Sequence, residues 1–240
     1  MTEPLLRVDG LAASYGQLQA VRGVSFDVEA GAALAVIGEN GAGKTTLFHT
    51  ICGLHEAAAG EVVLAGERLR GIPAHALVRR GIALVPEGRR IFPSLSVDEN
   101  LRVAEDQHGR GAPAGRARRW SRERVYGLFP DLRAAARRGG HQISGGQQQM
   151  LAIGRALLCE PRVLLLDEVS LGLSPAVVKL LYQALAAIRA EGMTLIFVEQ
   201  DVARGVAFSD HLVCLHKGSV RLAGPSRSSS LDEVRRAYFG

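Results

Sequence analysis

The fold is decided by the stretch GENGAGKTT, Gly38–Thr46. It fits the pattern G-x-x-x-x-G-K-[ST] and stands between an apolar run, Leu34–Ile37, and a helical run, Leu47–Leu54. This strand–loop–helix setting is the one that a phosphate-binding loop needs. Its glycines let backbone N–H groups converge on phosphate oxygens, and the helix adds the positive end of its dipole. The nucleotide-binding residues predicted in this loop are Gly38, Asn40, Gly41, Ala42, Gly43, Lys44, Thr45 and Thr46.

Two side chains of the loop carry specific roles. We expect Lys44 to reach the β- and γ-phosphates of a nucleoside triphosphate and the Thr45 hydroxyl to ligate Mg²⁺. A second element, VLLLDE at Val163–Glu168, is an apolar strand that ends in two acids. Ligands bind at this carboxyl edge of α/β sheets. Asp167 would orient Mg²⁺ through a water, and Glu168 would polarise the water that attacks the phosphate.

The stretch ISGGQQQMLAIGRAL, Ile143–Leu157, predicts a second anion site. Ser144 can cap the helix that follows, and Gly145 and Gly146 expose its N–H groups. The chain already has one phosphate-binding loop, so a second anion site has a role if that site binds the nucleotide of another subunit. The stretch resembles the LSGGQ signature of the ATP-binding-cassette (ABC) family, with Ile143 in place of the usual leucine.

This resemblance extends over essentially the whole chain and implies a dimer. In that family, two ATPase domains pack head to tail, and each ATP lies between the phosphate-binding loop of one and the signature of the other. The resemblance therefore implies ATP and Mg²⁺ as cofactors and a second ABC ATPase subunit as partner. It also implies four residues that contact the ATP held by that partner, namely Ser144, Gly145, Gly146 and Gln147.

Other family positions can be matched in the chain. Tyr15 stands where an aromatic residue stacks on adenine, although an exposed tyrosine in a turn is the alternative. Glu87 occupies the place of a glutamine that reaches Mg²⁺, and a solvated loop acid is the alternative there. Ser170–Pro175 matches the D-loop, which makes contacts across the dimer. Gln200 fills the position of the switch histidine; its amide can donate a hydrogen bond to the γ-phosphate but cannot carry a proton charge.

Some motifs of the chain are typical of one subgroup within the family. The segments VPEGRRIFPSLSVDENL, SLGLSP and VEQ resemble an ATP-binding subunit of the high-affinity branched-chain amino acid importer. This resemblance implies a heterodimer with a second cassette, two membrane permease subunits, an indirect link to an extracytoplasmic substrate-binding protein, and a peripheral place on the cytoplasmic face of the plasma membrane. The alternatives are a related importer for urea, amides or other amino acids, a soluble non-transport ABC ATPase, and a regulatory subunit with little hydrolysis.

The hydrophobic pattern predicts one α/β domain. The apolar runs that indicate strands are Leu34–Ile37, Val62–Ala65, Ile82–Val85, Val163–Leu166, Leu195–Val198 and Leu212–Leu215. Several are continuously apolar, as in strands buried on both faces of a partly parallel sheet. The first 30 residues alternate apolar with polar, which favours antiparallel strands. With the resemblance, this predicts a P-loop NTPase core, 1–89 and 161–240, with N-terminal antiparallel strands and an inserted helical lobe, 90–160, that bears the signature.

Composition sets further limits. The net charge is +5, but almost all of the positive charge is arginine, so the bias indicates genome composition more than a binding face. The Arg-rich segment 104–125 is interpreted as a mobile connector that leads into helices. In it, Trp120 alone could stack on a base, and no nucleic-acid partner is expected. The three cysteines form no CxxC pair, and no apolar run is long enough to span a bilayer.

Overall fold

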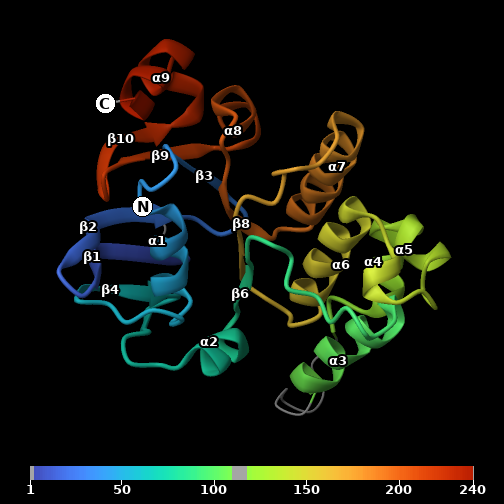
Figure 1. The fold of residues 1–240 in the computed structure, drawn as a ribbon. Helices are drawn as coiled ribbons and strands as arrows, with labels where there is room; N and C mark the ends of the chain where they lie inside the picture. The colour runs from blue at the N-terminus through green and yellow to red at the C-terminus, as the bar shows by residue number, and fades with distance from the viewer. Residues whose placement is uncertain (1–2, 110–117, 240) are drawn as a thin grey trace.

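The structure is a computed structural model that describes residues 3–109 and 118–239. Its strands form two sheets, which lie on either side of helix α1, Lys44–Ile51 (Figure 1). The four-stranded sheet has the order β2-β1-β4-β5 and is antiparallel. Its strands are β1 Leu6–Tyr15, β2 Leu18–Val28, β4 Ala59–Leu64 and β5 Glu67–Arg68. The predicted strand Val62–Ala65 thus belongs to the antiparallel sheet.

The six-stranded sheet has the order β10-β9-β3-β8-β7-β6 and is parallel except for its edge strand β10. Its strands are β3 Ala33–Ile37, β6 Ile82–Val85, β7 Val163–Leu166, β8 Thr194–Val198, β9 His211–His216 and β10 Ser219–Pro225. In the register, Val36 of β3 pairs with Val198 of β8, and Leu166 of β7 pairs with Phe197 of β8. The carboxyl ends of three neighbouring strands therefore lie together at one edge. The predicted α/β fold with N-terminal antiparallel strands is confirmed.

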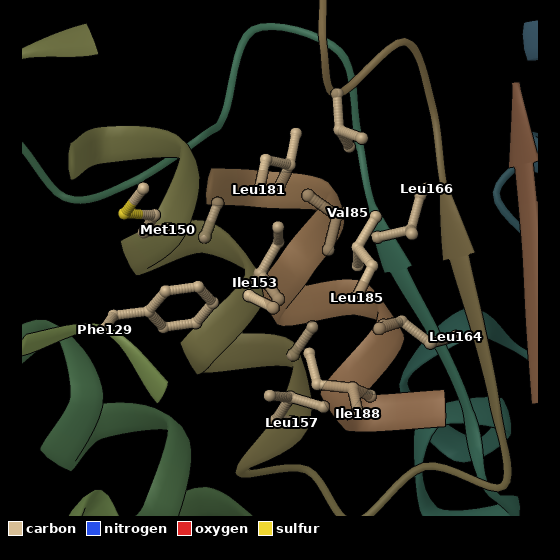
Figure 2. Close-up of a cluster of buried hydrophobic side chains, with 14 of the residues drawn as sticks. Val85, Phe129, Met150, Ile153, Leu157, Leu164, Leu166, Leu181, Leu185 and Ile188 are labelled. Atoms are coloured by element: carbon tan, nitrogen blue, oxygen red, sulfur yellow. The ribbon is translucent and has the colours of Figure 1, made fainter. Parts of the chain in front are cut away.

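Helices cover both faces of the parallel sheet because its strands are apolar on both sides. Beside α1 they are α2 Ala74–Arg80, α3 Val97–Gly109, α4 Arg122–Leu128, α5 Pro130–Ala134, α6 Gly145–Leu157, α7 Pro175–Ala190, α8 Val202–Phe208 and α9 Leu231–Phe239. Successive residues of β3 point to opposite faces: Ala35 joins one buried cluster, and Val36 joins the other. In the first cluster, side chains of α6 and α7 meet those of β6 and β7, as Ile153, Leu185 and Leu164 show (Figure 2).

Helices α3 to α6 lie beside the sheet, on the side of α7 (Figure 1). They share one continuous buried cluster with the sheet, so burial of apolar surface holds them to it. The boundaries of the helical lobe at residues 90 and 160 remain a prediction. Among the described residues, no helix combines the length and the apolar character that crossing a membrane requires.

The interpretation of 104–125 as a mobile connector is wrong for residues 104–109, which continue helix α3. Trp120 is buried at 1% exposure within the first cluster, so it packs as a core residue and is not free to stack on a base. The rest of the predicted connector, residues 110–117, lies outside the described residues.

Helix α1 also begins earlier than predicted, at Lys44, because Gly43 adopts a left-handed conformation that turns the chain directly into the helix.

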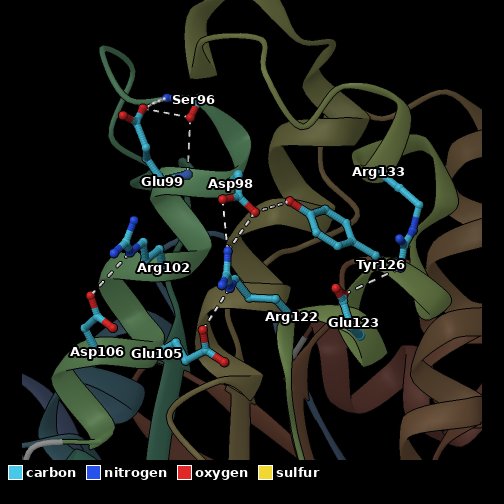
Figure 3. A network of polar contacts seen from close by, with 10 residues as sticks. All are labelled: Ser96, Asp98, Glu99, Arg102, Glu105, Asp106, Arg122, Glu123, Tyr126 and Arg133. Carbon is cyan, nitrogen blue, oxygen red and sulfur yellow. Dashed lines mark hydrogen bonds and ion pairs between the residues drawn. The ribbon is translucent and has the colours of Figure 1, made fainter.

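A polar network ties α3 to α4 (Figure 3). Arg122 donates through Nη1 to both oxygens of Asp98, at 3.0 and 2.9 Å, and through Nε to Glu105 at 2.8 Å. The Tyr126 hydroxyl donates to Asp98 at 2.9 Å, and burial is the main cause that raises the pKa of this hydroxyl. Because Arg122 of α4 bonds two carboxylates of α3 through different nitrogens, it links the two helices at two points. Sequence analysis gave these charges no role.

Candidate nucleotide site

A hollow of about 520 Å³ lies at the carboxyl edge of the six-stranded sheet. Most of the residues predicted to bind or cleave a nucleotide line it, although they come from five separate segments of the chain. These are Tyr15, Asn40, Gly41, Gly43, Lys44, Thr45, Thr46, Glu87, Glu168 and Gln200. Gly38 and Ala42 belong to the same loop and are buried behind its surface. The structure therefore brings together residues that the sequence could place only by motif.

The loop before α1 requires glycine for a local steric reason. Gly43 has φ of 101°, and a Cβ there would lie 2.3 Å from the carbonyl oxygen of Ala20. No side chain fits at that distance, so the loop can approach β2 only with glycine in place. The Leu47 N–H donates to the Gly43 carbonyl at 2.8 Å, which starts the helix. The N-terminus of α1 thus faces the hollow with its first N–H groups, a setting that favours anions.

Lys44 is held inside this loop. It is 4% exposed, and its Nζ donates to the carbonyl oxygens of Gly38 at 2.7 Å and Glu39 at 2.9 Å. The same Nζ lies 3.6 Å from a carboxylate oxygen of Glu168. A buried ammonium with a carboxylate beside it is electrostatically balanced, and it lies where a phosphate could take up its remaining donor capacity.

Asp167 is completely buried, and neither of its carboxylate oxygens has a hydrogen-bond partner among the described residues. Burial raises the pKa of this carboxyl to about 6, and the Thr45 hydroxyl, near it but outside ordinary hydrogen-bond geometry, counteracts the rise, as does Lys44. The carboxylates of Glu168 and Glu87 raise it further. An unsatisfied buried carboxylate is rare in proteins and calls for an explanation such as an ion.

The groups around Asp167 fit Mg²⁺. Thr45 offers a hydroxyl, and Glu87 and Asp167 offer carboxylates, which are the hard oxygen ligands that Mg²⁺ prefers. In the described part of the chain, no group of three His, Cys, Asp or Glu side chains forms a closed metal cage. That agrees with the way Mg²⁺ binds in nucleotide sites, where one or two carboxylates suffice because phosphates and waters complete the shell.

Glu168 and Gln200 are in direct contact. The Gln200 amide donates through Nε2 to Glu168 at 2.7 Å and, more weakly, to Asn40 Oδ1 at 3.4 Å. Glu168 has φ of 47°, an uncommon left-handed conformation for a residue with a side chain. Strain of this kind is found mostly at functional sites. The residue in the switch position therefore touches the predicted catalytic carboxylate directly.

Tyr15 lies at the rim of the hollow with 51% of its surface exposed. Its ring packs against the ring of His55, with centroids 4.4 Å apart and planes tilted by 35°. The His55 Nε2 atom is 3.1 Å from the backbone oxygen of Ser14, which fixes the ring. The exposed tyrosine face is thus held in one orientation and is available for stacking on a base.

The predicted signature residues lie at the start of α6, away from this hollow. Ser144 and Gln147 form a capping box: the Ser144 hydroxyl accepts from the Gln147 N–H, and the Gln147 side chain accepts from the Ser144 N–H. The predicted cap is confirmed. A Cβ at Gly146 would lie 2.7 Å from a Val177 methyl group, so this glycine is also required for packing against α7.

Two polar residues near these sites were missed by sequence analysis. Arg89 donates to Gln148 at 2.9 Å, and its guanidinium lies where a Cβ at Gly145 would be, 2.9 Å from Nη2. It adds a cation to the N-terminus of α6. Glu199 is buried next to Gln200 and accepts several hydrogen bonds. Both residues stand in stretches that the sequence singled out, but no motif assigns them a role.

Comparison with known proteins identifies the family. The family model described as ABC transporter matches residues 21–170. The chain is 37% identical, over 98% of its length and all of the relative, to the high-affinity branched-chain amino acid transport ATP-binding protein BraG of Pseudomonas aeruginosa. The chain belongs to the ABC transporter family. A probable branched-chain amino acid transport ATP-binding protein, LivF of Archaeoglobus fulgidus, is 34% identical over 92% of each chain.

Solved structures agree with the ABC fold. An ATP-binding subunit of an ABC transporter is 28% identical and superimposes with a TM-score of 0.82 over 98% of this chain and 100% of its own. A nucleotide-free cassette, 22% identical over 99% of this chain and 96% of its own, has the same TM-score and supports the fold alone. This chain is therefore an ABC-type ATPase, the hydrolytic component of a transporter. The roles of its individual site residues remain predictions.

Proposed function

We propose that this ABC ATPase powers the import of branched-chain amino acids through a membrane permease. The observation that carries the chemistry is the hollow lined by Lys44, Glu168 and Gln200, with the buried carboxylate of Asp167 directly before Glu168 in the chain. Relatives that match this chain over 92% or more of its length, and whose names state branched-chain amino acid transport, support the substrate class. ATP is the proposed substrate of the hollow, with Tyr15 stacked on its base.

The residues divide the work of hydrolysis. Lys44 and the N–H groups at the start of α1 bind the β- and γ-phosphates. Thr45, Asp167 and Glu87 would hold Mg²⁺, directly or through water, and the bound ion would neutralise charge at the phosphates. Glu168 polarises the attacking water, and Gln200 orients Glu168 by the 2.7 Å hydrogen bond and donates to the γ-phosphate when the site closes.

The second half of the site comes from a partner. Ser144, Gly145, Gly146 and Gln147 bind the γ-phosphate held by another cassette, and that cassette's signature completes the hollow of this chain. We propose a heterodimer with a second ABC ATPase, docked on two permease subunits at the cytoplasmic face of the plasma membrane. An extracytoplasmic substrate-binding protein would act with the permease and not touch this chain. Solved structures of dimeric cassettes with the same fold support pairing in general.

The test is uptake of labelled leucine, with urea in a parallel assay, by a transporter assembled from this chain, a second ABC ATPase and two permease subunits. We expect leucine uptake to depend on ATP and to be lost in Lys44→Ala, whose ATP affinity measured by calorimetry should also be lost. Glu168→Gln should bind ATP, retain no turnover and accumulate as a closed dimer in size-exclusion chromatography. Uptake of urea but not of leucine would refute the substrate assignment, and unchanged ATP affinity in Lys44→Ala would refute the site.

The same assembly tests whether its two sites work equally. We expect the site on this chain's phosphate-binding loop to be the weaker one, because Gln200 replaces the switch histidine there. Ser144→Arg blocks the partner's nucleotide and should damage transport severely. Gln200→Ala removes one orienting contact and should do modest harm, less than the 2.7–4 kcal/mol or so that a lost transition-state donor costs. If Gln200→Ala stops transport and Ser144→Arg is tolerated, the asymmetry runs the other way. Equal moderate effects would show that the two sites act together.

A further inference from the structure

Glu199 is a buried acid next to the nucleotide hollow but outside its wall. It follows β8 directly and is 3% exposed. One of its carboxylate oxygens accepts from the backbone N–H groups of Gln200 at 3.0 Å and Asp201 at 3.1 Å, and from Arg204 at 3.2 Å. A buried charge is stable only when it is paired and hydrogen-bonded, and Glu199 is both.

The other Glu199 oxygen binds two hydroxyl groups from further segments. Ser170, two residues after Glu168 in the chain, donates to it at 2.9 Å. Tyr182 of α7 donates to it as well, and the Tyr182 ring is fixed by edge contacts to Phe197 and Phe208. Glu199 therefore joins the segment after β7 to the segment after β8 and attaches both to α7 and α8.

The two segments that Glu199 joins are those that carry Glu168 and Gln200. Ser170 lies in the short turn that begins at Glu168 and that the Leu171 N–H closes by donating to the Glu168 carbonyl at 3.0 Å. The Ser170 hydroxyl and the Gln200 backbone N–H both donate to the Glu199 carboxylate. These contacts hold the two segments together where the Gln200 amide donates to Glu168 at 2.7 Å.

We propose that Glu199 is a positioning residue that holds Gln200 against the catalytic carboxylate Glu168. The inference rests on the proposed function, which assigns those two residues their roles. Glu199 is buried and is not among the residues that line the hollow, so we expect it to touch neither phosphate nor the attacking water. Its effect on hydrolysis passes through Gln200, so removing Gln200 should make hydrolysis insensitive to Glu199.

The test substitution is Glu199→Gln, which keeps the shape of the side chain and lets the hydroxyls of Ser170 and Tyr182 rotate to accept from the new amide. The control is Asp210→Asn. Asp210 also pairs with an arginine, Arg189, and accepts from a backbone N–H at 2.8 Å, but it lies at the amino end of β9, the opposite edge of the sheet. Both variants lose one charge from a hydrogen-bonded ion pair, so both should lower the melting temperature.

Hydrogen exchange of the purified full-length chain gives the first readout. The amide protons of Gln200 and Asp201 should exchange about tenfold faster in Glu199→Gln than in the wild type, because their acceptor carries less charge. In Asp210→Asn their exchange should not change. Unchanged exchange at both amides in Glu199→Gln would overturn the inference, and this readout does not depend on whether the chain hydrolyses ATP.

Hydrolysis by the assembled transporter gives the second readout. Glu199→Gln should lower kcat about threefold to tenfold with little change in the KM for ATP, and Asp210→Asn should leave kcat unchanged. The double variant of Glu199→Gln and Gln200→Ala should match Gln200→Ala within about twofold. If the losses in kcat from the two substitutions multiply, the positioning role of Glu199 is overturned, while the proposed role of Gln200 stands. If Gln200→Ala itself hydrolyses at the wild-type rate, the proposed role of Gln200 fails and the role of Glu199 falls with it.

Discussion

Asp167 and Glu199 are two buried acids that follow neighbouring parallel strands, β7 and β8, and their surroundings are opposite. Both oxygens of Asp167 lack a hydrogen-bond partner among the described residues, and burial raises the pKa of its carboxyl to about 6. Both oxygens of Glu199 accept hydrogen bonds, and Arg204 balances its charge. The unsatisfied acid is the one that we propose to hold a cation, and the satisfied acid is the one that we propose to hold the reacting groups in place.

At this edge of the sheet, one buried acid lowers the stability of the fold and the other raises it. An unpaired buried carboxylate destabilises the fold, and proteins keep such groups where activity needs them. A carboxylate with a complete set of donors stabilises its surroundings, and removing it leaves those donors without partners. The two acids should therefore respond in opposite directions when each loses its charge.

The largest expected effect is on stability when Glu199 is removed. Glu199→Ala leaves two hydroxyls and two backbone N–H groups without their acceptor and leaves Arg204 paired with Asp201 alone, so the free energy of unfolding should fall by about 3–5 kcal/mol. Urea unfolding of the isolated chain measures this. Glu191→Ala is the control, because Glu191 pairs with Arg124 at the partly exposed surface and should cost under about 1 kcal/mol. If the free energy of unfolding falls equally in the two variants, the buried Glu199 carboxylate stabilises the fold no more than a surface ion pair does.

The second effect has the opposite sign. The pKa of Asp167 is about 6 in the folded chain, above its unfolded value of roughly 3.9. Its protonated form therefore contributes stability below about pH 4 that is lost as the pH rises through about 6. Asp167→Asn should raise the free energy of unfolding at pH 7.5 by about 3 kcal/mol, with the gain vanishing near pH 4.

Thermal unfolding against pH, without nucleotide or Mg²⁺, measures the Asp167→Asn effect. If Asp167→Asn is less stable than the wild type at pH 7.5, the Asp167 carboxylate has hydrogen-bond partners in solution, and its contrast with Glu199 fails. The same scan on Glu199→Gln is the control and should show a loss at pH 7.5, since that substitution removes the charge that Arg204 balances.

The sequence predicted the elements of this edge but not the division between its two acids. The strands β3, β7 and β8 follow from continuous apolar runs, and the motifs at Gly38–Thr46 and Val163–Glu168 place their ends in one site. Whether an acid at a strand end is paired depends on side chains from elements distant in sequence, such as Tyr182 and Arg204. Local patterns carry no information on those pairs.

The same limit explains the error in the Arg-rich segment. Charge and glycine content favoured a connector over 104–125, yet residues 104–109 are helical and Trp120 is buried. The contacts of Arg122 with Asp98 and Glu105, 24 and 17 residues away, bring the helix α4 against α3. Burial of Trp120 and Val125 in the first cluster, together with these long-range contacts, decides the local structure, and local composition does not reveal it.

The smallest effect is expected in this helical network. Arg122→Met keeps the apolar stem of the side chain but removes its contacts with Asp98 and Glu105. Because Arg122 and Asp98 are each about a third or more exposed, the free energy of unfolding should fall by only about 1 kcal/mol. Chemical unfolding and ATP calorimetry, run together, should show that small loss with unchanged ATP affinity. A large loss of affinity would mean that the network also shapes the nucleotide hollow.

The most direct measurement is the affinity of the chain for ATP with and without Mg²⁺, by calorimetry, for the wild type and Asp167→Asn. The central claim is that the unpaired carboxylate of Asp167 exists to hold the Mg²⁺ that accompanies ATP. Mg²⁺ should therefore strengthen ATP binding by the wild type about tenfold or more, as a charged contact allows, and should have little effect in Asp167→Asn. An equal Mg²⁺ effect in both chains would contradict the claim.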